Sequence, residues 1–339
     1  MKTIKIIQLI IFILAAVFLI GLLCMFIFNK INFSQIFRQE AQIELLSQTQ
    51  DVKEISKISL DMRSADIIIN PSDTDEISIN YRGPKSLKNK LDLTVTVSGG
   101  ELVIKQNYDS QNFFFWSWNL TPRVLEITLP ESYADDLNIA NTSGDLTITG
   151  NYRLSNFGAH LTSGDVRLSD IECSGFSLES TSGDVELGRI DTTELRMSLT
   201  SGQIEAKELT GTGTIGSFSG DIRIEKLIGD VEISATSGEI TIGALSGSGS
   251  VSCSSGDINI SVVESTGDLL VKASSGSIDL GFGADAAYEF DAHCTSGDVT
   301  ANFPITYAGD NNTASGQIGT KPYNNLDVKT TSGDIDLAA

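Results

Sequence analysis

The sequence predicts an all-β protein: a β-solenoid of about eleven stacked coils, with an N-terminal β cap and one N-terminal transmembrane helix. Three observations predict it. A Ser-Gly pair recurs through the second half of the chain, apolar and polar residues alternate around each pair, and one long apolar segment opens the sequence. A repeat period near 20 residues is typical of solenoids, whose coils each bury their inner face against a neighbour.

The repeat is defined by a glycine that follows serine in every unit. Successive glycines lie 17 to 21 residues apart, and the second residue after each is Leu, Val or Ile. The glycines are Gly144, Gly164, Gly183, Gly202, Gly220, Gly238, Gly256, Gly276, Gly297, Gly316 and Gly333. In one unit Phe176 and Leu178 precede the glycine and Val185 and Leu187 follow it, with polar residues between them. This period of two predicts two short half-buried strands per coil, joined by a tight turn.

The turn chemistry explains the Ser-Gly-Asp consensus. Glycine tolerates the positive φ that a tight turn requires, and an Asp carboxylate accepts backbone N–H groups within turns. Structural capping is therefore the favoured role of the acids from Asp145 to Asp334. The alternative is a calcium ladder, since hard cations prefer several oxygen ligands. Against a ladder, Gln203, Ser277 and Gln317 interrupt the acids.

The first 28 residues predict a membrane anchor. Ile4 to Phe28 is almost unbroken apolar sequence, and as a helix it would be about 37 Å long, enough to cross a bilayer. A cleaved signal peptide and a lipoprotein modified at Cys24 are the alternatives. The apolar run is longer than a signal sequence needs, and Gly21-Leu22-Leu23 lacks the small residue expected just before a lipidated cysteine.

The charge distribution sets the expected location. The chain has 23 basic and 44 acidic residues, a net charge of -21, which disfavours nucleic acid as a partner. Lys2 and Lys5 precede the apolar segment, so the N-terminus is expected in the cytoplasm and the remainder outside. The prediction is a single-pass protein of a bacterial cell membrane with an extracytoplasmic C-terminal domain, held to the membrane through its N-terminal helix.

Between the anchor and the repeats, the sequence predicts two further segments. Residues 29–51 are expected to be a juxtamembrane tether, with an amphipathic helical turn through Ile36, Phe37, Ile43, Leu45 and Leu46. Residues 52–135 are expected to be a β cap out of register with the repeat. Its strands are Ile58–Leu60, Ala65–Ile69, Ile77–Asn80, Leu91–Val97, Leu102–Ile104 and Val124–Leu129.

An aromatic stretch lies within the predicted cap. Phe113 to Trp118 is the most apolar stretch after the anchor, expected either to pack on the cap or to contact the membrane interface or a partner.

Residues 136–339 form the repeat domain, which ends in mid-repeat. An open solenoid end exposes a strand edge, so charges such as Asp336 are expected to protect it.

The cysteines and histidines do not form a predicted site. Cys253 and Cys294 occupy inward positions two coils apart, about 9.6 Å, which is too far for a disulfide. Cys173 is in another coil, and Cys24 in the anchor. His160 and His293 lie on the outer face about 34 Å apart, too distant to share a metal or a catalytic dyad. We expect no enzyme activity and no catalytic, cofactor-binding or metal residues.

The repeats resemble a known family. Thr181-Ser182-Gly183-Asp184-Val185 and Thr331-Ser332-Gly333-Asp334-Ile335 are similar to a bacterial β-strand-repeat family of unknown function whose members are described as putative adhesins. Ser64-Ala65-Asp66-Ile67 in the cap shows the same likeness. The resemblance implies a non-enzymatic adhesin or envelope scaffold, with a cell-wall, glycan or envelope-protein partner. The alternative that it implies is an accessory or regulatory component of a cell-envelope stress-response system.

Overall fold

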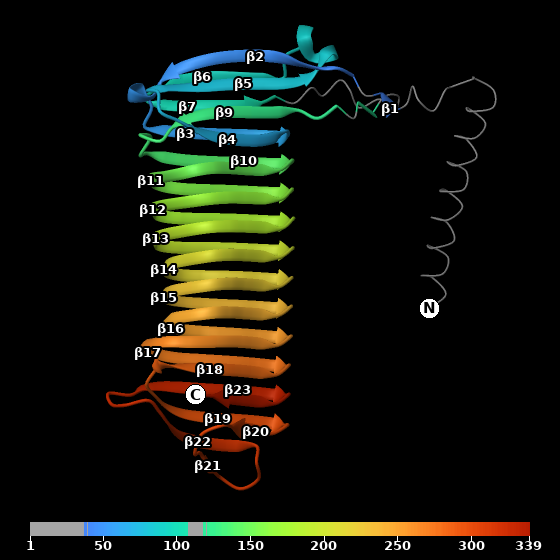
Figure 1. The fold of residues 1–339 in the computed structure, drawn as a ribbon. Coiled ribbons are helices and arrows are strands. Elements are labelled where there is room, and N and C mark those ends of the chain that lie inside the picture. The colour runs from blue at the N-terminus through green and yellow to red at the C-terminus, as the bar shows by residue number, and fades with distance from the viewer. Residues whose placement is uncertain (1–36, 39, 108–117, 120) are drawn as a thin grey trace, which may run out of the picture.

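The computed structural model describes residues 37–38, 40–107, 118–119 and 121–339, and it is an all-β stack (Figure 1). A single 22-stranded sheet system contains all strands except the short parallel pair of β1 (Phe37–Arg38) and β8 (Trp118–Asn119). The predicted anchor, residues 1–28, lies outside the described residues, as do Phe113 to Ser117. In the described ranges, no helix has the length and apolar character needed to span a bilayer.

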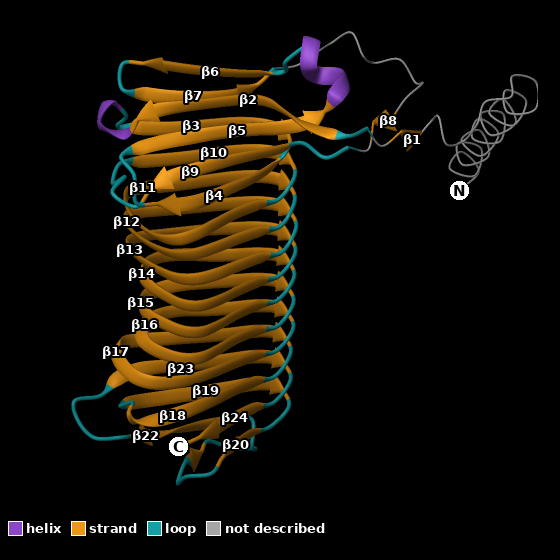
Figure 2. Ribbon diagram, turned by 45° about the horizontal axis from the view of Figure 1, so that its top comes forward, coloured by secondary structure: helices purple, strands orange, loops and turns teal. Residues whose placement is uncertain are grey.

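The repeat forms long strands, each running from one Ser-Gly turn to the next. Each strand bends midway, so it contributes to both faces of the stack (Figure 2), and it pairs in parallel and nearly in register with the strand of the next coil. Two separate strands per coil were expected, but pairing continues through the bend. These strands are β11 (Leu146–Ser163), β12 (Val166–Ser182), β13 (Val185–Ser201), β14 (Ile204–Ser219), β15 (Ile222–Ser237), β16 (Ile240–Ser255) and β17 (Ile258–Ser275).

The predicted alternation places a continuous apolar core between the two faces. In β12, Val166 and Leu168 are buried on one side of the bend, and Phe176 and Leu178 on the other. Phe157 stacks on Phe176 with ring centroids 5.1 Å apart. Each fully buried Leu, Ile or Phe contributes about 1.5–3 kcal/mol, and because every coil shares this pattern, the core runs the length of the stack.

The N-terminal cap begins with a coil that is in register with the repeat, which the sequence analysis missed. Its strands β3 and β4 pair in parallel with β10 and β11, with Ser64 opposite Ser143. Ala65 stands where later coils have glycine, so alignment on glycine did not reveal it. The strands are β3 (Lys57–Ser64), β4 (Asp66–Ser72) and β10 (Asp136–Ser143).

Above this coil the pairing changes from parallel to antiparallel. β7 and β9 continue the stack in parallel on β3 and β4, and then β6, β5 and β2 add antiparallel edges. The bounds are β2 (Gln42–Asp51), β5 (Glu76–Pro84), β6 (Leu93–Ser98), β7 (Glu101–Gln106) and β9 (Val124–Pro130), with 3-10 helices η1 (Val52–Glu54) and η2 (Lys85–Asn89). The six expected cap strands are all present.

Strand β2 corrects the expected helical turn in the tether. Ile36 lies outside the described residues, and Phe37 belongs to β1. Ile43, Leu45 and Leu46 belong to β2, which pairs antiparallel with β5 with one irregularity at Leu45. Leu45 and Leu46 pack against the core. Their apolar spacing fits a helix in isolation, but a free cap edge offers strand pairing, which satisfies the backbone of both segments.

The C-terminal coils are stacked out of sequence order. β23 lies between β17 and β19, and β24 lies between β18 and β20, parallel to both neighbours. In Figure 1 the C-terminus accordingly lies within the stack. The strands are β18 (Ile278–Asp285), β19 (Tyr288–Ser296), β20 (Val299–Ala301), β21 (Thr306–Tyr307), β22 (Thr313–Ile318), β23 (Asn324–Ser332) and β24 (Ile335–Ala338).

This order overturns two expectations. Gly316 is not a turn of an eleventh coil, because it lies inside β22, which pairs antiparallel with β19. The chain end is not an open edge guarded by Asp336, because β24 is paired on both sides. The far end of the stack is instead covered by β22 and by β21, which pairs with β22.

Candidate functional site

The glycine turns form one edge of the stack, and close packing explains why they need glycine. Ten of the eleven aligned glycines have φ between 116° and 144°, and Gly316 is the exception. A Cβ added to Gly183 would lie 2.0 Å from the carbonyl oxygen of Gly164 in the coil before it. The predicted positive φ is confirmed, and the stack adds a steric reason that no single turn could reveal.

The aspartates beside these glycines form a hydrogen-bonded ladder. The Oδ1 atom of Asp145 accepts the backbone N–H of Asp165 at 2.9 Å, and Asp165 accepts that of Asp184 at 3.1 Å. The same bond recurs at other turns, where Asp184 accepts the backbone N–H of Gln203, Asp221 that of Glu239, Asp257 that of Ser277 and Asp334 that of Asp298. Capping occurs between coils, where a bond inside one turn was expected.

Where Gln or Glu follows the turn glycine in place of Asp, the longer side chain bonds a different group. Gln203 donates to the carboxylate of Glu205 at 2.6 Å, and Glu239 accepts from the hydroxyl of Thr241 at 3.1 Å. One extra methylene therefore carries the polar group past the turn. Among the described residues, no group of three or more His, Cys, Asp or Glu side chains is arranged to hold a metal ion.

Two arginines reinforce the ladder on the strand after the turn. Arg167 lies 3.1 Å from Asp165 Oδ2, and Arg223 lies 2.8 Å from Asp221 Oδ2. The pKa of Asp221 is lowered, chiefly by the N–H of Glu239 and further by Arg223. These carboxylates use both oxygens within the fold, which favours the structural role over the calcium alternative.

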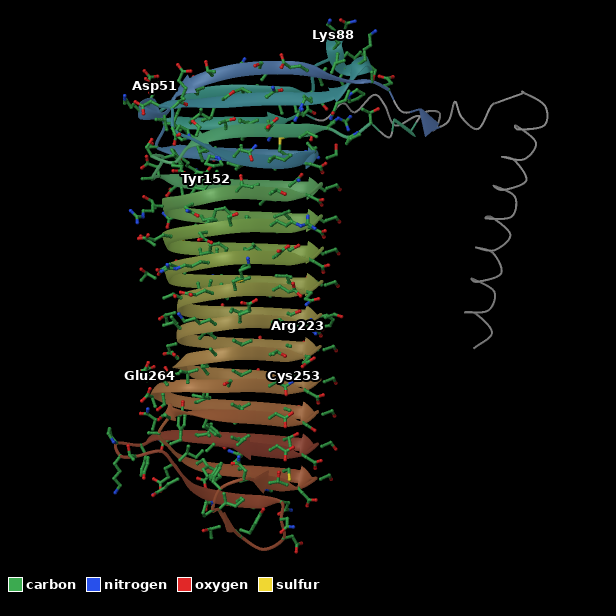
Figure 3. The ribbon with its side chains drawn as sticks, viewed as in Figure 1. Asp51, Lys88, Tyr152, Arg223, Cys253 and Glu264 are labelled. Carbon is green, nitrogen blue, oxygen red and sulfur yellow. The ribbon has the colours of Figure 1, made fainter. Side chains whose placement is uncertain are left out.

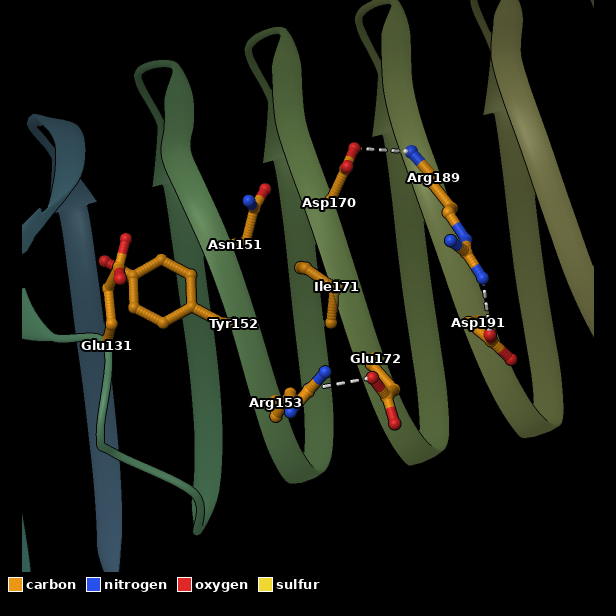
Figure 4. Close-up of a pocket in the computed structure, with 9 residues that line it drawn as sticks. All are labelled: Glu131, Asn151, Tyr152, Arg153, Asp170, Ile171, Glu172, Arg189 and Asp191. Atoms are coloured by element: carbon orange, nitrogen blue, oxygen red, sulfur yellow. Dashed lines mark hydrogen bonds and ion pairs between the residues drawn. The ribbon is translucent and has the colours of Figure 1, made fainter.

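The opposite edge, where the strands bend, carries a charged hollow of about 400 Å³ near the cap. Figure 4 shows Arg153 paired with Glu172 at 3.0 Å and Arg189 paired with Asp191 at 3.0 Å. The backbone N–H of Arg189 also bonds Asp170 at 3.0 Å. Figure 3 places Tyr152 at this edge and Arg223 toward the turns. Because these charges are mutually paired and exposed, the hollow is a solvated salt-bridge array.

The most exposed large apolar side chain among the described residues is Phe218, at 63%. It stands two residues before Gly220, a position that Thr200 and Thr236 hold in the neighbouring coils. Beside it runs a row of small uncharged residues in mutual register: Ser198, Gly216, Ser234 and Ser252. The ring therefore projects from a flat polar face. Phe218 was not among the predicted candidates, although it replaces threonine at this position of the repeat.

The histidines lie where the pattern predicted. His160 is exposed and 3.1 Å from Glu179, and His293 is exposed and 2.9 Å from Thr313. They sit on coils far apart in the stack, so they do not share a site.

The three described cysteines, Cys173, Cys253 and Cys294, are free and buried, and burial raises the pKa of each thiol. Ala273 and Thr330 stand between Cys253 and Cys294. Their separation is thus three coils, whereas sequence order predicted two. Cys24 lies outside the described residues.

A stack of parallel coils with glycine turns and a mixed β cap defines a β-solenoid of the toast-rack kind. The Toastrack DUF4097 family model matches residues 55–244 and 228–338, and the chain belongs to this family. The resemblance inferred from the Thr-Ser-Gly-Asp repeats is confirmed. A search of curated proteins finds no match.

Three solved structures are similar to this chain at low identity, each with a TM-score below 0.5. A putative cell adhesion protein from Clostridium sporogenes is 12% identical, covering 88% of this chain and 99% of its own, with a TM-score of 0.22. A putative adhesin from Bacteroides fragilis is 15% identical, and the match covers 89% of this chain and 99% of that one, with a TM-score of 0.37. A putative lipid binding protein from Parabacteroides distasonis is 20% identical, and the match covers 73% of this chain and 96% of that one, with a TM-score of 0.39. Identities this low carry no information about a shared ligand.

Proposed function

We propose that this chain is a membrane-anchored, extracytoplasmic protein that acts without catalysis, as an adhesin or envelope scaffold. The apolar segment from Ile4 to Phe28 would hold it in a bacterial cell membrane. The stack would then present its outer faces to the cell envelope.

The observation that carries the proposal is Phe218. An aromatic ring exposed to 63% offers a large apolar surface that a partner can cover. The adjacent row of serines and Gly216 leaves space around the ring and offers hydroxyl groups. A sugar ring suits such a surface, since its C–H face packs on the aromatic ring while its hydroxyls bond the serines. A glycan of the cell wall is therefore the proposed partner class.

The test is cosedimentation of the full-length chain, in detergent, with isolated cell-wall material. In parallel, the same tagged chain is used for affinity capture from detergent-solubilised membrane proteins. Phe218→Thr restores the residue of neighbouring coils and should weaken wall binding about threefold to tenfold, the range of one aromatic contact. Val263→Thr is the matched control, because Val263 is also apolar and 41% exposed but lies on another coil.

The outcomes separate the alternatives. Wall binding that falls with Phe218→Thr but not with Val263→Thr supports the adhesin or scaffold role. Capture of a solubilised membrane protein, without wall binding, would instead favour the accessory role in an envelope stress-response system. Equal wall binding by both variants and the wild type would show that Phe218 does not contribute to binding.

A further inference from the structure

The C-terminal segment fills a slot that the rest of the chain leaves open. After β18 the chain passes through Ala286 and Ala287 into β19, and these two strands belong to coils that are not neighbours. β23 and β24 occupy the space between them, hydrogen-bonded to β17 and β18 on one side and to β19 and β20 on the other. Residues 324–338 are thus an inserted coil.

The slot between the two neighbouring coils fits a segment that has the sequence pattern of the repeat. Leu326, Val328, Ile335 and Leu337 of the insert are each 2% exposed or less, so they complete the core. At the turn, a Cβ on Gly333 would meet the carbonyl oxygen of Gly276 at 2.2 Å. A segment that fits must therefore alternate apolar residues around a Ser-Gly turn.

The insert is joined to the fold by an exposed link. Gly319, Thr320, Lys321 and Pro322 are all exposed, and the loop leading into β23 projects from the side of the stack (Figure 1). Like charges also lie on both faces of the insert, where Asp336 is in register with Asp279 and Asp327 with Asp291. Lys329 offsets one of them, at 2.6 Å from Asp327.

We propose that the insert exchanges between molecules, so that β23 and β24 of one copy fill the slot of a second copy of this chain. A reciprocal exchange preserves every contact of the insert and changes only the link, which is the condition under which strand swapping costs little. The coils of β11 to β17 continue directly into a neighbouring coil, whereas the insert is joined to the stack through its exposed link. The segment best able to enter the slot of another molecule is therefore the insert of a second copy. Exchange would join two molecules through the C-terminal coils of their stacks.

The test uses the register of one column. Thr330 is buried between Ala273 and Cys294, and Cys253 and Cys294 show that the column accepts cysteine. A full-length donor chain carries Thr330→Cys together with Cys294→Ala. The acceptor is the wild-type chain with a different affinity tag. The new thiol at position 330 can reach Cys294 of the acceptor only if the inserts have exchanged.

The two chains are mixed in detergent across a range of concentrations, treated with a mild oxidant, and mapped by peptide mass spectrometry. The expected result is an interchain disulfide between position 330 and Cys294 whose yield rises in proportion to concentration. The single variant Thr330→Cys is the control and should form the same bond within one chain. An intrachain bond in the control with no interchain bond in the mixture would overturn the proposal. Failure of the intrachain bond would overturn it too, because the slot geometry itself would be wrong.

Discussion

Gly183 packs directly on the backbone of Gly164, with the site of a missing Cβ only 2.0 Å from the Gly164 carbonyl oxygen. The same approach recurs from coil to coil along the turn edge, for example between Gly220 and Gly202. The spacing of the sheet at this edge is therefore fixed by backbone contact. Any side chain at these positions must push two coils apart, which the long parallel ladders resist.

Gly183→Ala is expected to destabilise the stack by at least about 2 kcal/mol, through positive φ and the backbone clash together. Gly216→Ala is the control, because its Cβ would lie 3.6 Å from Ser234 Oγ, an ordinary contact, without positive φ. Thermal unfolding of the two variants measures the difference. Equal melting temperatures would show that the turn can relax.

Asp184→Ala should cost about 1 kcal/mol, because it leaves the N–H of Gln203 without its 3.0 Å acceptor. Asp184→Asn keeps an oxygen in place and should cost less. Asp184→Glu should behave like the alanine variant, since Gln203 and Glu239 bond other groups from the same column. A glutamate variant as stable as wild type would contradict the side-chain length argument.

The ladder also predicts the response to calcium. The Oδ1 atoms of the turn aspartates already accept backbone N–H groups, so a bound ion would compete with those bonds for the same oxygens. The melting temperature should be the same in a chelator and in millimolar calcium. If calcium raised the melting temperature of the wild type and Asp184→Asn abolished that increase, the calcium alternative would be restored.

The sequence predicts what is local and misses what is tertiary. The turn at Gly183 and the strands around it follow from residues within one period. Ser315-Gly316 and Ser332-Gly333 look alike in sequence, yet the first lies in an antiparallel strand and the second in a coil turn. Because all coils share one pattern, that pattern does not specify which coil stacks on which. Ala65 shows the converse, a coil in register without the marker glycine.

The candidate site follows the same division. Phe218 could be found from the sequence, because it breaks a column of threonines and serines two residues before the turn glycines. The charged hollow could not, because the residues that surround it depend on where each coil bends, and the pairing of β11 with β12 shifts register between Ile148 and Asn151. Arg153 and Glu172, like Arg189 and Glu208, then lie side by side on neighbouring coils.

Acid should weaken the contribution of Asp221. Its pKa lies below the ordinary value of 3.8 because the folded state stabilises the carboxylate through the N–H of Glu239 and through Arg223. The stabilisation is therefore complete above pH 3.8 and is lost as the pH falls through the folded pKa. Asp221→Asn should lower stability by about 1 kcal/mol or less at pH 7, given solvent screening. The stabilities of the wild type and the variant should become equal below the folded pKa. A difference in stability that persists there would contradict the charge argument.

Asp279 should have the opposite effect, at the coil next to the insert. Partial burial, and then the neighbouring Asp336 of β24, raise the pKa of Asp279 above 3.8. The folded state therefore binds the proton more tightly than the unfolded chain. Stability falls as the pH rises from 3.8 through the raised pKa, and the penalty is complete above it.

Asp279→Asn should accordingly stabilise the protein at pH 7. Because Asp279 and Asp336 are both exposed, the gain should be at most about 1 kcal/mol. Well below pH 3.8 the variant and the wild type should be equally stable. Asp336→Asn should do the same, although it also alters the contact with Thr300. Because both substitutions relieve one repulsion, the double variant should gain less than the sum of the two. Melting temperatures of the four proteins across pH measure that coupling. Strict additivity would mean that Asp279 and Asp336 do not repel each other, and that like charge does not weaken the insert on this face.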